Sequence, residues 1–312
     1  MNRPVLVTGA AGFAGSHLLD HLAGDGVATM AWHRPGGSPP RQLPGVVWQG
    51  VDLYDQAAVR AALAMAAPAV VFHCAGAAHV GQSWSATVKT LQANVMGTHH
   101  LVEALRAAMP DTKLLITSSA LVYGPSSEAV DESHPLLPAN PYGLSKLAQE
   151  LVAVSTGGHE HSYVARPFNH VGPRQDPSFV SAAFAKQIAE IEAGLVPPEI
   201  HVGNLEARRD LTDVRDTVRA YRLIVERGTP HRPYNICTGR AIAVRDVLDA
   251  LLSHARVTVR VVHDPERYRP NDTPLVLGDP TRAAAELGWT PRIAFEQTAY
   301  DLLEHWRARV RG

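Results

Sequence analysis

Residues 5–15 read Val-Leu-Val-Thr-Gly-Ala-Ala-Gly-Phe-Ala-Gly, a short apolar strand pattern that runs into three glycines spaced three residues apart. Gly9 allows a tight turn, Gly12 lets the backbone approach a pyrophosphate, and Gly15 lets a helix pack closely against the strand. A helical pattern over Phe13–Ala23 follows at once, so the positive end of its dipole would face the phosphates. Such glycines can also form a purely structural turn, but at the start of a strand–helix–strand unit they predict a dinucleotide-binding site.

The first half of the chain continues to alternate strand-length apolar runs with amphipathic helical stretches. Strands are predicted at Pro4–Thr8, Val27–Trp32, Val46–Gln49, Ala69–Cys74, Lys113–Ser118 and Ser162–Arg166, and helices at Phe13–Ala23, Asp55–Ala66, Thr87–Ala108 and Tyr142–Val154. The central strands are apolar throughout, which is typical of a parallel sheet covered by helices on both faces. The pattern predicts an α/β fold with a Rossmann-like, doubly wound parallel sheet.

After Pro167 the pattern becomes less regular and predicts a smaller, interrupted C-terminal lobe for a substrate. Helices are expected at Phe179–Ala193, Val214–Arg227, Val244–His254 and near Thr281 and Phe295, with strands at Ile200–Gly203, Tyr234–Cys237 and Val257–His263. We expect residues 1–168 with 206–239 to form the dinucleotide-binding domain, and residues 169–205 with 240–312 to form the substrate lobe.

The composition excludes several classes of partner. The 312 residues hold 29 Lys and Arg against 30 Asp and Glu, a net charge of −1, so bulk charge cannot hold nucleic acid or an anionic membrane. The two cysteines, Cys74 and Cys237, provide no disulfide framework and favour a reducing compartment. The sequence shows no cleavable apolar leader, and its most apolar window, residues 61–80, is interrupted by Pro68 and two histidines. We therefore expect a cytoplasmic protein.

The end of the second predicted strand indicates which dinucleotide is preferred. An NAD-preferring site places a carboxylate there, about 20 residues past the glycines, for the ribose 2′-hydroxyl. This chain has Trp32-His33-Arg34 instead, and Arg34 either clamps a 2′-phosphate or is a solvated surface residue. We predict NADP(H), with NAD(H) left open. Asp52, at the end of the third predicted strand, is placed either to reach the adenine end of the dinucleotide or to cap the helix that starts at Asp55.

A tyrosine and a lysine at positions 142 and 146 supply a candidate proton donor. In Tyr142-Gly143-Leu144-Ser145-Lys146 the two side chains share one face of a predicted helix. A phenol with a pKa of about 10 is a poor acid at neutral pH, and a nearby ammonium is expected to lower that pKa. The chain has only four lysines, and the pair follows a strand that ends in Thr117-Ser118-Ser119. On its own, the spacing would equally fit a solvated helix face.

Taken together, the glycine loop, the strand-end serines and Tyr-x-x-x-Lys resemble the extended short-chain dehydrogenase/reductases that act on nucleotide sugars. Further stretches of similarity are His73–Gly76 and Asn94–Thr98. The second half is most similar to GDP-6-deoxy-D-mannose reductases, in the segments Arg166–Pro173, Phe184–Ile188, Val202–Leu205, Arg209–Asp216 and Arg269–Asp272. The resemblance covers essentially the whole chain. It implies reduction of the C4 keto group of GDP-4-dehydro-6-deoxy-D-mannose to give GDP-D-rhamnose.

The resemblance also implies roles for individual residues. Ser119, or less favourably Ser118, would hold the carbonyl oxygen of the substrate, Tyr142 would protonate it, and Lys146 would also bind the nicotinamide ribose. The cofactor-binding set would be Gly9, Ala11, Gly12, Phe13, Ala14, His33, Arg34, Asp52, Leu53, Cys74, Ala75, Gly76, Thr117, Tyr142 and Lys146. The substrate-binding set would be Ser83 (expected in a loop), Ser118, Ser119, Asn169, Val180, Arg209, Arg269 and Asp272. Arg209 and Arg269 would bind the diphosphate and Asp272 the ribose hydroxyls, and the alternative for each is a surface ion pair or a turn residue.

Two residues argue against the dehydratase branch of the same group. Sugar-nucleotide 4,6-dehydratases carry Asp-Glu immediately before a Val-Tyr-Gly segment, where this chain has Ala120 and Leu121, so elimination of water lacks its acid and base. A nucleotide-sugar C4-epimerase stays open, because it needs only the Tyr and Lys and a tightly bound cofactor. A non-catalytic NADP-sensing protein is disfavoured because Tyr142 and Lys146 are both present.

The sixteen histidines do not predict a metal site. His17 and His21 lie on the helix after the glycine loop, and His159-Glu160-His161 is compact, but the spacing offers no third ligand to either group.

The helices Thr87–Ala108 and Tyr142–Val154 carry more apolar residues than one core-facing stripe needs, and related enzymes dimerise through the equivalent pair of helices. We therefore expect a homodimer with a four-helix seam.

Overall fold

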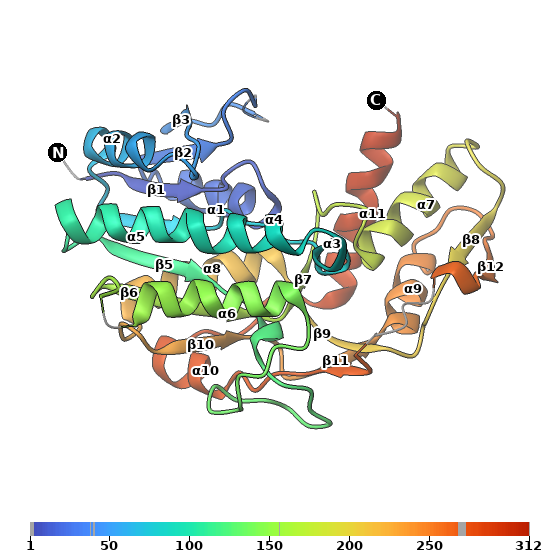
Figure 1. The fold of residues 1–312 in the computed structure, drawn as a ribbon. Helices are drawn as coiled ribbons and strands as arrows, with labels where there is room; N and C mark the ends of the chain where they lie inside the picture. Colours follow the sequence, from blue (N-terminus) through green and yellow to red (C-terminus); the bar gives the residue numbers. More distant parts are fainter. Residues whose placement is uncertain (1–2, 38, 40, 156, 268–272, 312) are drawn as a thin grey trace.

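Seven parallel strands form the main sheet, in the order β10-β6-β5-β4-β1-β2-β3 (Figure 1). The computed structural model describes residues 3–37, 39, 41–155, 157–267 and 273–311. The strands are β1 Val5–Thr8, β2 Thr29–His33, β3 Val46–Gly50, β4 Val70–His73, β5 Lys113–Thr117, β6 Ser162–Pro167 and β10 Pro233–Ile236. All neighbouring strands pair in parallel, so the prediction of a Rossmann-like, doubly wound α/β fold is confirmed.

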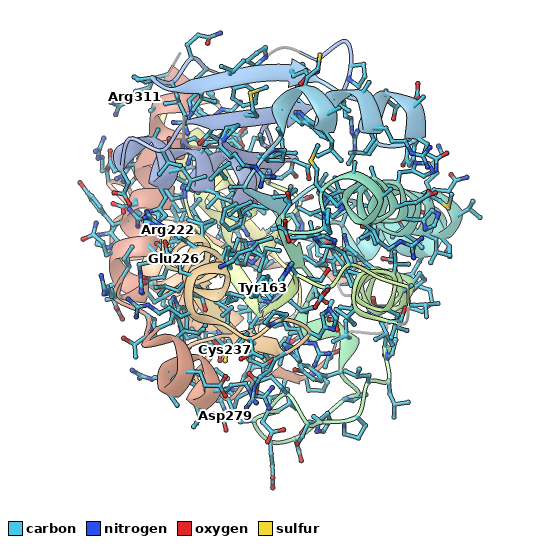
Figure 2. All side chains as sticks on the ribbon, turned by 90° about the vertical axis from the view of Figure 1, so that its left-hand side faces the viewer. Tyr163, Arg222, Glu226, Cys237, Asp279 and Arg311 are labelled. Atoms are coloured by element: carbon cyan, nitrogen blue, oxygen red, sulfur yellow. The ribbon has the colours of Figure 1, made fainter. Side chains whose placement is uncertain are left out.

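Successive residues of the central strands pack against opposite layers of helices, because side chains alternate between the two faces of a strand. Val7 belongs to the core that includes α1 (Phe13–Gly24) and α8 (Val214–Arg227). Leu6 belongs to the core on the opposite face, with the helices α2 (Gln56–Ala66), α5 (Gly97–Ala108) and α6 (Pro141–Val154). The exposed side of α8 is charged, and Arg222 and Glu226 form an ion pair of 2.6 Å there (Figure 2).

The predicted helix Thr87–Ala108 is wrong in one respect, because it is not continuous. It consists of α4 (Thr87–Leu91), the π-helical segment η1 (Gln92–Met96) and α5, and the short helix α3 (Val80–Ser85) precedes it. A π-helical segment holds more residues per turn than an α-helix, so it changes which side chains face the interior. Asn94 and Thr98, within and just after η1, are both fully buried.

The second lobe has a hydrophobic core of its own. In it, α7 (Val180–Glu192), α9 (Val244–Leu252) and α11 (Phe295–Arg311) pack together beside the paired strands β8 (Glu199–Val202) and β12 (Arg260–His263), to one side of the main sheet (Figure 1). Four short strands that the sequence did not predict form another sheet, namely β7 Asn169–Val171, β9 Arg208–Asp213, β11 Ala241–Ala243 and β13 Leu275–Val276. The helix α10 (Thr281–Leu287) packs with the core of the first lobe.

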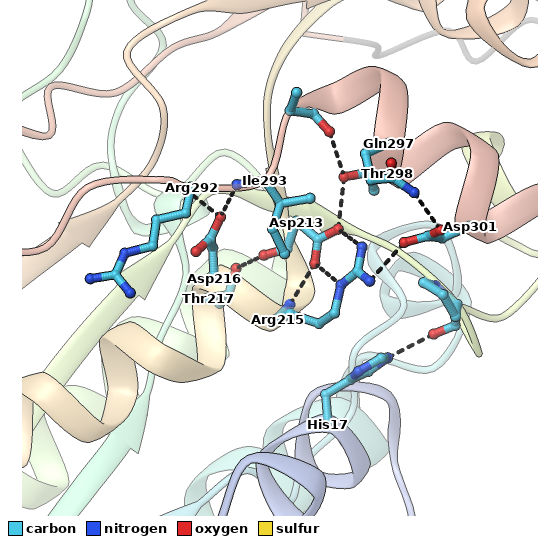
Figure 3. A network of polar contacts seen from close by, with 12 residues as sticks. His17, Asp213, Arg215, Asp216, Thr217, Arg292, Ile293, Gln297, Thr298 and Asp301 are labelled. Carbon is cyan, nitrogen blue, oxygen red and sulfur yellow. Dashed lines mark hydrogen bonds and ion pairs between the residues drawn. The ribbon is translucent and has the colours of Figure 1, made fainter. Parts of the chain in front are cut away.

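Asp213, where β9 meets α8, joins the two lobes. Its carboxylate caps α8 by accepting from the Arg215 amide N–H at 2.7 Å, and it also accepts from the Arg215 guanidinium and the Thr298 hydroxyl of α11, both at 2.7 Å (Figure 3). Asp216 accepts from the backbone N–H groups of residues 292–293, just before α11. Buried carboxylates therefore hold the C-terminal helix against the first lobe. Across the described ranges, no helix has both the length and the apolar content needed to cross a membrane.

Candidate active site

The glycine loop lies where the strand order of the main sheet reverses, between β1 and β4. Gly9 has φ +63°, and a Cβ on it would lie 2.6 Å from the Ala75 backbone, so only glycine fits there. Gly12 caps α1 without a side-chain hydrogen bond, and the first turn of α1 carries no acidic residue. The N–H groups at this end of α1 therefore present a positive surface to an anion. The loop fits the pyrophosphate of a dinucleotide.

A cavity of about 650 Å³ opens in front of this loop. Ala11, Gly12 and Phe13 form one wall, and the opposite wall comes from the second lobe and the segment that leads into it. This opposite wall carries Arg174, Lys186 of α7 and Arg309 of α11 together with the carboxylates of Asp176 and Glu190. Lys186 is paired with Glu190 at 2.9 Å and Arg174 with Asp20 at 2.7 Å. A negatively charged ligand on the loop would therefore face a wall of mixed charge across the cavity, in which Arg309 has no carboxylate partner among the described residues to neutralise it.

The residues predicted for the adenine end follow β2 and β3. Arg34 is exposed, and its guanidinium has no hydrogen-bond or ion-pair partner among the described residues. His33 Nδ1 lies 2.7 Å from the Arg34 carbonyl oxygen. Asp52 accepts from the backbone N–H of Tyr54, and the residue that caps α2 is Asp55, so the capping alternative for Asp52 is wrong. The Leu53 carbonyl lies 2.9 Å from His100 Nδ1.

Ser119, Tyr142 and Lys146 come together at the carboxyl end of β5. Asn140 caps α6 by accepting from the Gly143 amide at 2.8 Å, which starts the helix one residue before Tyr142. The Ser119 side chain lies near enough to the Tyr142 phenol to act on its pKa. Lys146 Nζ lies 5.9 Å from the centre of the Tyr142 ring and donates to the Thr117 carbonyl at 2.8 Å. The sequence-predicted triad is therefore assembled in space.

Burial dominates the acid–base properties of this triad. It raises the pKa of Tyr142 to about 12, although Ser119 acts in the opposite direction. This is contrary to the expectation that the nearby ammonium lowers the phenol pKa. Burial also lowers the pKa of Lys146 to about 8. At neutral pH the phenol thus keeps its proton and the amine is charged.

Two serines of the predicted substrate set are engaged by the protein itself. The Ser118 hydroxyl donates to Glu150, a buried carboxylate that is ion-paired with Arg166 at 2.7 Å. Ser118 is therefore part of a structural network, and Ser119 is the serine that acts on the Tyr142 phenol. The expectation that Ser83 lies in a loop is wrong, because it is buried in α3 and donates to the Val80 carbonyl at 2.6 Å.

The other predicted substrate residues lie at the start of the second lobe and on β9. Asn169 begins β7 and Val180 begins α7, and both are exposed. Arg209 is on β9, and its guanidinium donates to the Arg208 carbonyl at 2.9 Å. Because β7 pairs with β9, Asn169 and Arg209 lie on adjacent strands. Arg269 and Asp272 lie outside the described residues.

The site also contains residues for which the sequence analysis gave no role. The His170 ring stacks on Phe13, with ring centres 5.6 Å apart. Asn94 donates to Ser145 Oγ at 2.8 Å, and Gln149 accepts from Lys146 Nζ at 3.0 Å. The spacing of Gln149, three residues after Lys146, is the one signal that could have found it. Over the described ranges, no group of three His, Cys, Asp or Glu side chains could hold a metal ion.

Comparison with known proteins identifies the family. The family described as GDP-mannose 4,6 dehydratase matches residues 6–302. The GDP-6-deoxy-D-mannose reductase of Pseudomonas aeruginosa is 35% identical over 322 residues, which cover 100% of this chain and 99% of the relative. The structure of RMD from Pseudomonas aeruginosa complexed with NADPH has a TM-score of 0.85 and 32% identity, and the match covers 99% of this chain and 100% of that chain.

A second kind of enzyme is similar at a lower identity. The structure of the Thermus thermophilus UDP-glucose 4-epimerase in complex with NAD has a TM-score of 0.84 and 29% identity, with 97% of this chain and 99% of that chain covered. Reductases and epimerases thus share this fold over nearly their whole lengths. The family match and the reductase at 35% identity together show that the chain belongs to the GDP-mannose 4,6-dehydratase family, within the extended short-chain dehydrogenase/reductase oxidoreductases.

Proposed function

We propose that this enzyme uses NADPH to reduce the C4 keto group of GDP-4-dehydro-6-deoxy-D-mannose, giving GDP-D-rhamnose. The observation that carries the proposal is the Ser119, Tyr142 and Lys146 cluster next to Ala120 and Leu121. The cluster has a proton donor for a carbonyl oxygen, while the two apolar side chains supply no acid or base for the elimination of water. The relative at 35% identity is itself a GDP-6-deoxy-D-mannose reductase, which supports the same reaction.

The mechanism follows from what each side chain can do. Ser119 and Tyr142 hydroxyls hold the C4 carbonyl oxygen by hydrogen bonds and align C4 with the cofactor site. Bound NADPH supplies a hydride. As C4 is reduced, the Tyr142 hydroxyl transfers its proton to the oxygen, so that the ketone becomes an alcohol without a free alkoxide. Lys146 would hold the nicotinamide ribose and would keep a positive charge next to the tyrosine oxygen as that oxygen loses its proton.

The cofactor preference follows from Arg34. Its exposed guanidinium has no partner in the described part of the chain and follows β2, where a carboxylate would repel a 2′-phosphate. A guanidinium can bind that phosphate through paired hydrogen bonds. The NADPH complex of RMD from Pseudomonas aeruginosa supports this preference, and NAD(H) remains the alternative.

The substrate is held, in this proposal, by the second lobe and the segments that lead into it. Asn169 and Val180 lie at the entrance of that lobe, and Arg209 is the described candidate for the diphosphate. Arg269 and Asp272 complete the set that the family resemblance implies. A nearly neutral chain needs such local arginines, because its bulk charge does not attract a nucleotide.

The test is the oxidation of NADPH when the purified enzyme meets GDP-4-dehydro-6-deoxy-D-mannose, followed by NMR of the sugar product. We expect one NADPH consumed per sugar and a single C4 alcohol. A C4-epimerase would interconvert GDP- or UDP-hexoses without consuming NADPH, which would replace the proposal. A chain that binds NADPH but turns over no nucleotide sugar would overturn it.

We also propose a homodimer formed by α4, η1 and α6. These segments carry exposed apolar side chains, which a partner surface would remove from water. They are Val88 on α4, Met96 on η1, and Leu144 and Leu151 on α6, and Trp84 on the preceding α3 is exposed as well.

A further inference from the structure

A continuous chain of buried hydrogen bonds runs from the cofactor loop to Lys146, through residues that the mechanism above does not use. The Thr8 hydroxyl, at the end of β1, lies 2.7 Å from His73 Nδ1, and His73 Nε2 lies 2.8 Å from Thr98 Oγ1. Gln149 Nε2 donates to the same Thr98 oxygen at 2.9 Å, and Gln149 Oε1 accepts from Lys146 Nζ at 3.0 Å. Thr8, His73, Thr98 and Gln149 are all fully buried.

The donors and acceptors of this chain can be satisfied in one arrangement. The Thr98 hydroxyl donates to the Asn94 carbonyl at 2.7 Å, so its oxygen is left to accept from both His73 and Gln149. His73 then carries its proton on Nε2 and accepts from the Thr8 hydroxyl at Nδ1. Burial lowers the pKa of His73 to about 3, so the ring is neutral, as this arrangement requires. The carboxamide of Gln149 is thereby fixed with its nitrogen on Thr98 and its oxygen on Lys146.

Lys146 depends on this carboxamide for its position. Among the described residues, its hydrogen-bond acceptors are the Thr117 carbonyl at 2.8 Å and Gln149 Oε1. An ammonium has three protons to donate, and two fixed acceptors leave one proton for a ligand. Without Gln149, a single acceptor remains, and the long side chain can rotate about that one contact.

We propose that Gln149 is a positioning residue for the reduction: held in one orientation by Thr98 and His73, it aims the Lys146 ammonium at the cofactor. The inference rests on the proposed function, because it takes from it the contact between Lys146 and the nicotinamide ribose. It goes beyond the Ser-Tyr-Lys triad by adding a fourth side chain whose effect reaches the cofactor only through Lys146. The network also connects that ammonium to Thr8, which immediately precedes the cofactor loop.

Several groups face Lys146, so its titration has to be separable from theirs. They are Cys74 and His73 at the end of β4, Glu150 and Tyr142 on α6, and His170 on β7. Burial raises the pKa values of Cys74 and Tyr142 to about 12 and lowers those of His73 and His170. The pKa of Lys146 is about 8, so a change between pH 7 and 10 reports on this amine.

The test is the affinity for NADPH as a function of pH, measured by nucleotide fluorescence without any sugar present. For the unchanged enzyme we expect the affinity to weaken as the pH rises through about 8. Gln149→Met removes an acceptor from the ammonium and should move that midpoint about one pH unit lower. Gln149→Glu places a carboxylate against the ammonium and should move it about one unit higher.

The matched control is Gln187→Met on α7, which removes a carboxamide bonded to Ala183 and His201 and should keep the midpoint unchanged. If Gln149 were merely structural, both of its variants would lose stability and keep the original midpoint. That result, or a shift in the same direction in both variants, overturns the inference. Failure of the proposed function is visible separately, because the unchanged enzyme would then bind NADPH with its midpoint intact and oxidise none of it with the keto sugar.

A second pair of variants tests the orientation of Gln149 at Thr98, where Val has almost the volume of Thr and Ser is smaller by one methyl group. Thr98→Val removes the hydroxyl that orients Gln149, and Thr98→Ser keeps it. We expect a lower midpoint in Thr98→Val and the original midpoint in Thr98→Ser. Equal midpoints in the two variants would show that Thr98 and His73 do not orient Gln149, and would overturn that part of the inference.

Discussion

Burial acts on Tyr142 and Lys146 in opposite directions, because removing water disfavours the charged form of each group. The charged phenol is the deprotonated one, so its pKa rises to about 12, whereas the charged amine is the protonated one, so its pKa falls to about 8. At neutral pH the site therefore holds a protonated phenol beside an ammonium. A carbonyl can be reduced from that state, since the tyrosine still has the proton that it must donate.

The pH dependence of turnover follows from the same two values. Activity needs the Lys146 ammonium, so kcat/KM for the keto sugar should fall as the pH rises through about 8, and Tyr142 should contribute no change below that pH. Initial rates of NADPH oxidation from pH 6 to 10 measure this. Lys146→Arg keeps its charge over the whole range and should lose the alkaline decline, even at a reduced maximal rate. A flat profile up to pH 10 in the unchanged enzyme would contradict the role of Lys146.

The proton donor is tested by Tyr142→Phe. The variant keeps the ring and loses only the hydroxyl, so kcat should fall by roughly a hundredfold or more, while the NADPH Kd stays within about twofold. Stopped-flow turnover and a fluorescence titration measure the two quantities. Tyr163→Phe removes a phenol hydroxyl from the core of the first lobe instead and should leave kcat unchanged. An unaltered kcat in Tyr142→Phe would remove the tyrosine from the mechanism.

The choice between the two dinucleotides is tested by Arg34→Ala. The KM for NADPH should rise by about tenfold because the 2′-phosphate loses its guanidinium, while the KM for NADH, which has no such phosphate, should change little. Steady-state kinetics with both cofactors measure the ratio. Arg60→Ala, on α2 and paired with Glu103, is the control for a general loss of surface charge. If the unchanged enzyme has a lower KM for NADH than for NADPH, the preference is wrong.

Individual site residues could be predicted where a short motif defines them, as for Gly9 or Tyr142. For Gln149 the spacing from Lys146 is the one signal, because its role depends on Thr98, 51 residues away in the sequence, and on the π-helical segment next to Thr98. Ser83 was expected in a loop, but a hydrogen bond to the Val80 carbonyl satisfies its hydroxyl, so the side chain can be buried in a short helix.

At the scale of elements, apolar runs locate the strands of the main sheet to within a residue or two, because both faces of those strands must be buried. The strand β9 was missed because it reads Arg-Arg-Asp-Leu-Thr-Asp. Its Asp210 is fully buried, and its carboxylate accepts from the backbone N–H groups of Thr238 and Gly239 at 2.7 and 2.9 Å. Polar strands of this kind are stabilised by partners that sequence periodicity cannot reveal.

The junction of β9 and α8 should be a costly place to remove a carboxylate. Asp213→Ala takes away the α8 cap and leaves the Thr298 hydroxyl and the Arg215 guanidinium without their shared partner, so the free energy of unfolding should fall by about 3 kcal/mol. Chemical denaturation followed by circular dichroism measures the loss. Asp301→Asn breaks only the more exposed contact of Arg215 and should cost under about 1 kcal/mol. Equal losses in the two variants would show that Asp213 does not join the lobes.

At the scale of the molecule, the two lobes are interleaved along the chain, which makes their boundary hard to predict. The chain leaves the first lobe after β6, returns to it with α8 and β10, leaves again, and returns once more with α10. Ala283, Leu287 and Trp289 are fully buried in the core of the first lobe. We therefore propose to keep the predicted division but to assign residues 281–289 to the dinucleotide-binding lobe, because a segment belongs to the core in which its apolar side chains are buried.

The proposed dimer follows from what the first lobe leaves uncovered. On α6, Leu144 and Leu151 are 49% and 53% exposed and lie seven residues apart, so they share one face of the helix. On the neighbouring α4, Val88 is 67% exposed. Apolar side chains at this spacing on two adjacent helices form a stripe, and the same stripe on a second copy would complete a four-helix seam with twofold symmetry.

Light scattering at micromolar concentration should therefore give twice the 33.6 kDa mass of the chain. Each seam residue contacts the seam of the other copy, and a substitution is present in both copies. A symmetric dimer would therefore bury two charges for each position that is changed to arginine. Leu151→Arg combined with Val88→Arg should accordingly give the monomer mass, whereas Val261→Arg, on β12 of the second lobe, should leave the dimer intact. A monomer mass for the unchanged chain would refute the dimer, and a dimer that survives both seam charges would place its contact elsewhere. Because α6 carries both the seam and the Tyr142–Lys146 pair, loss of the dimer should also lower kcat, and turnover of the double variant measured beside its mass checks this coupling.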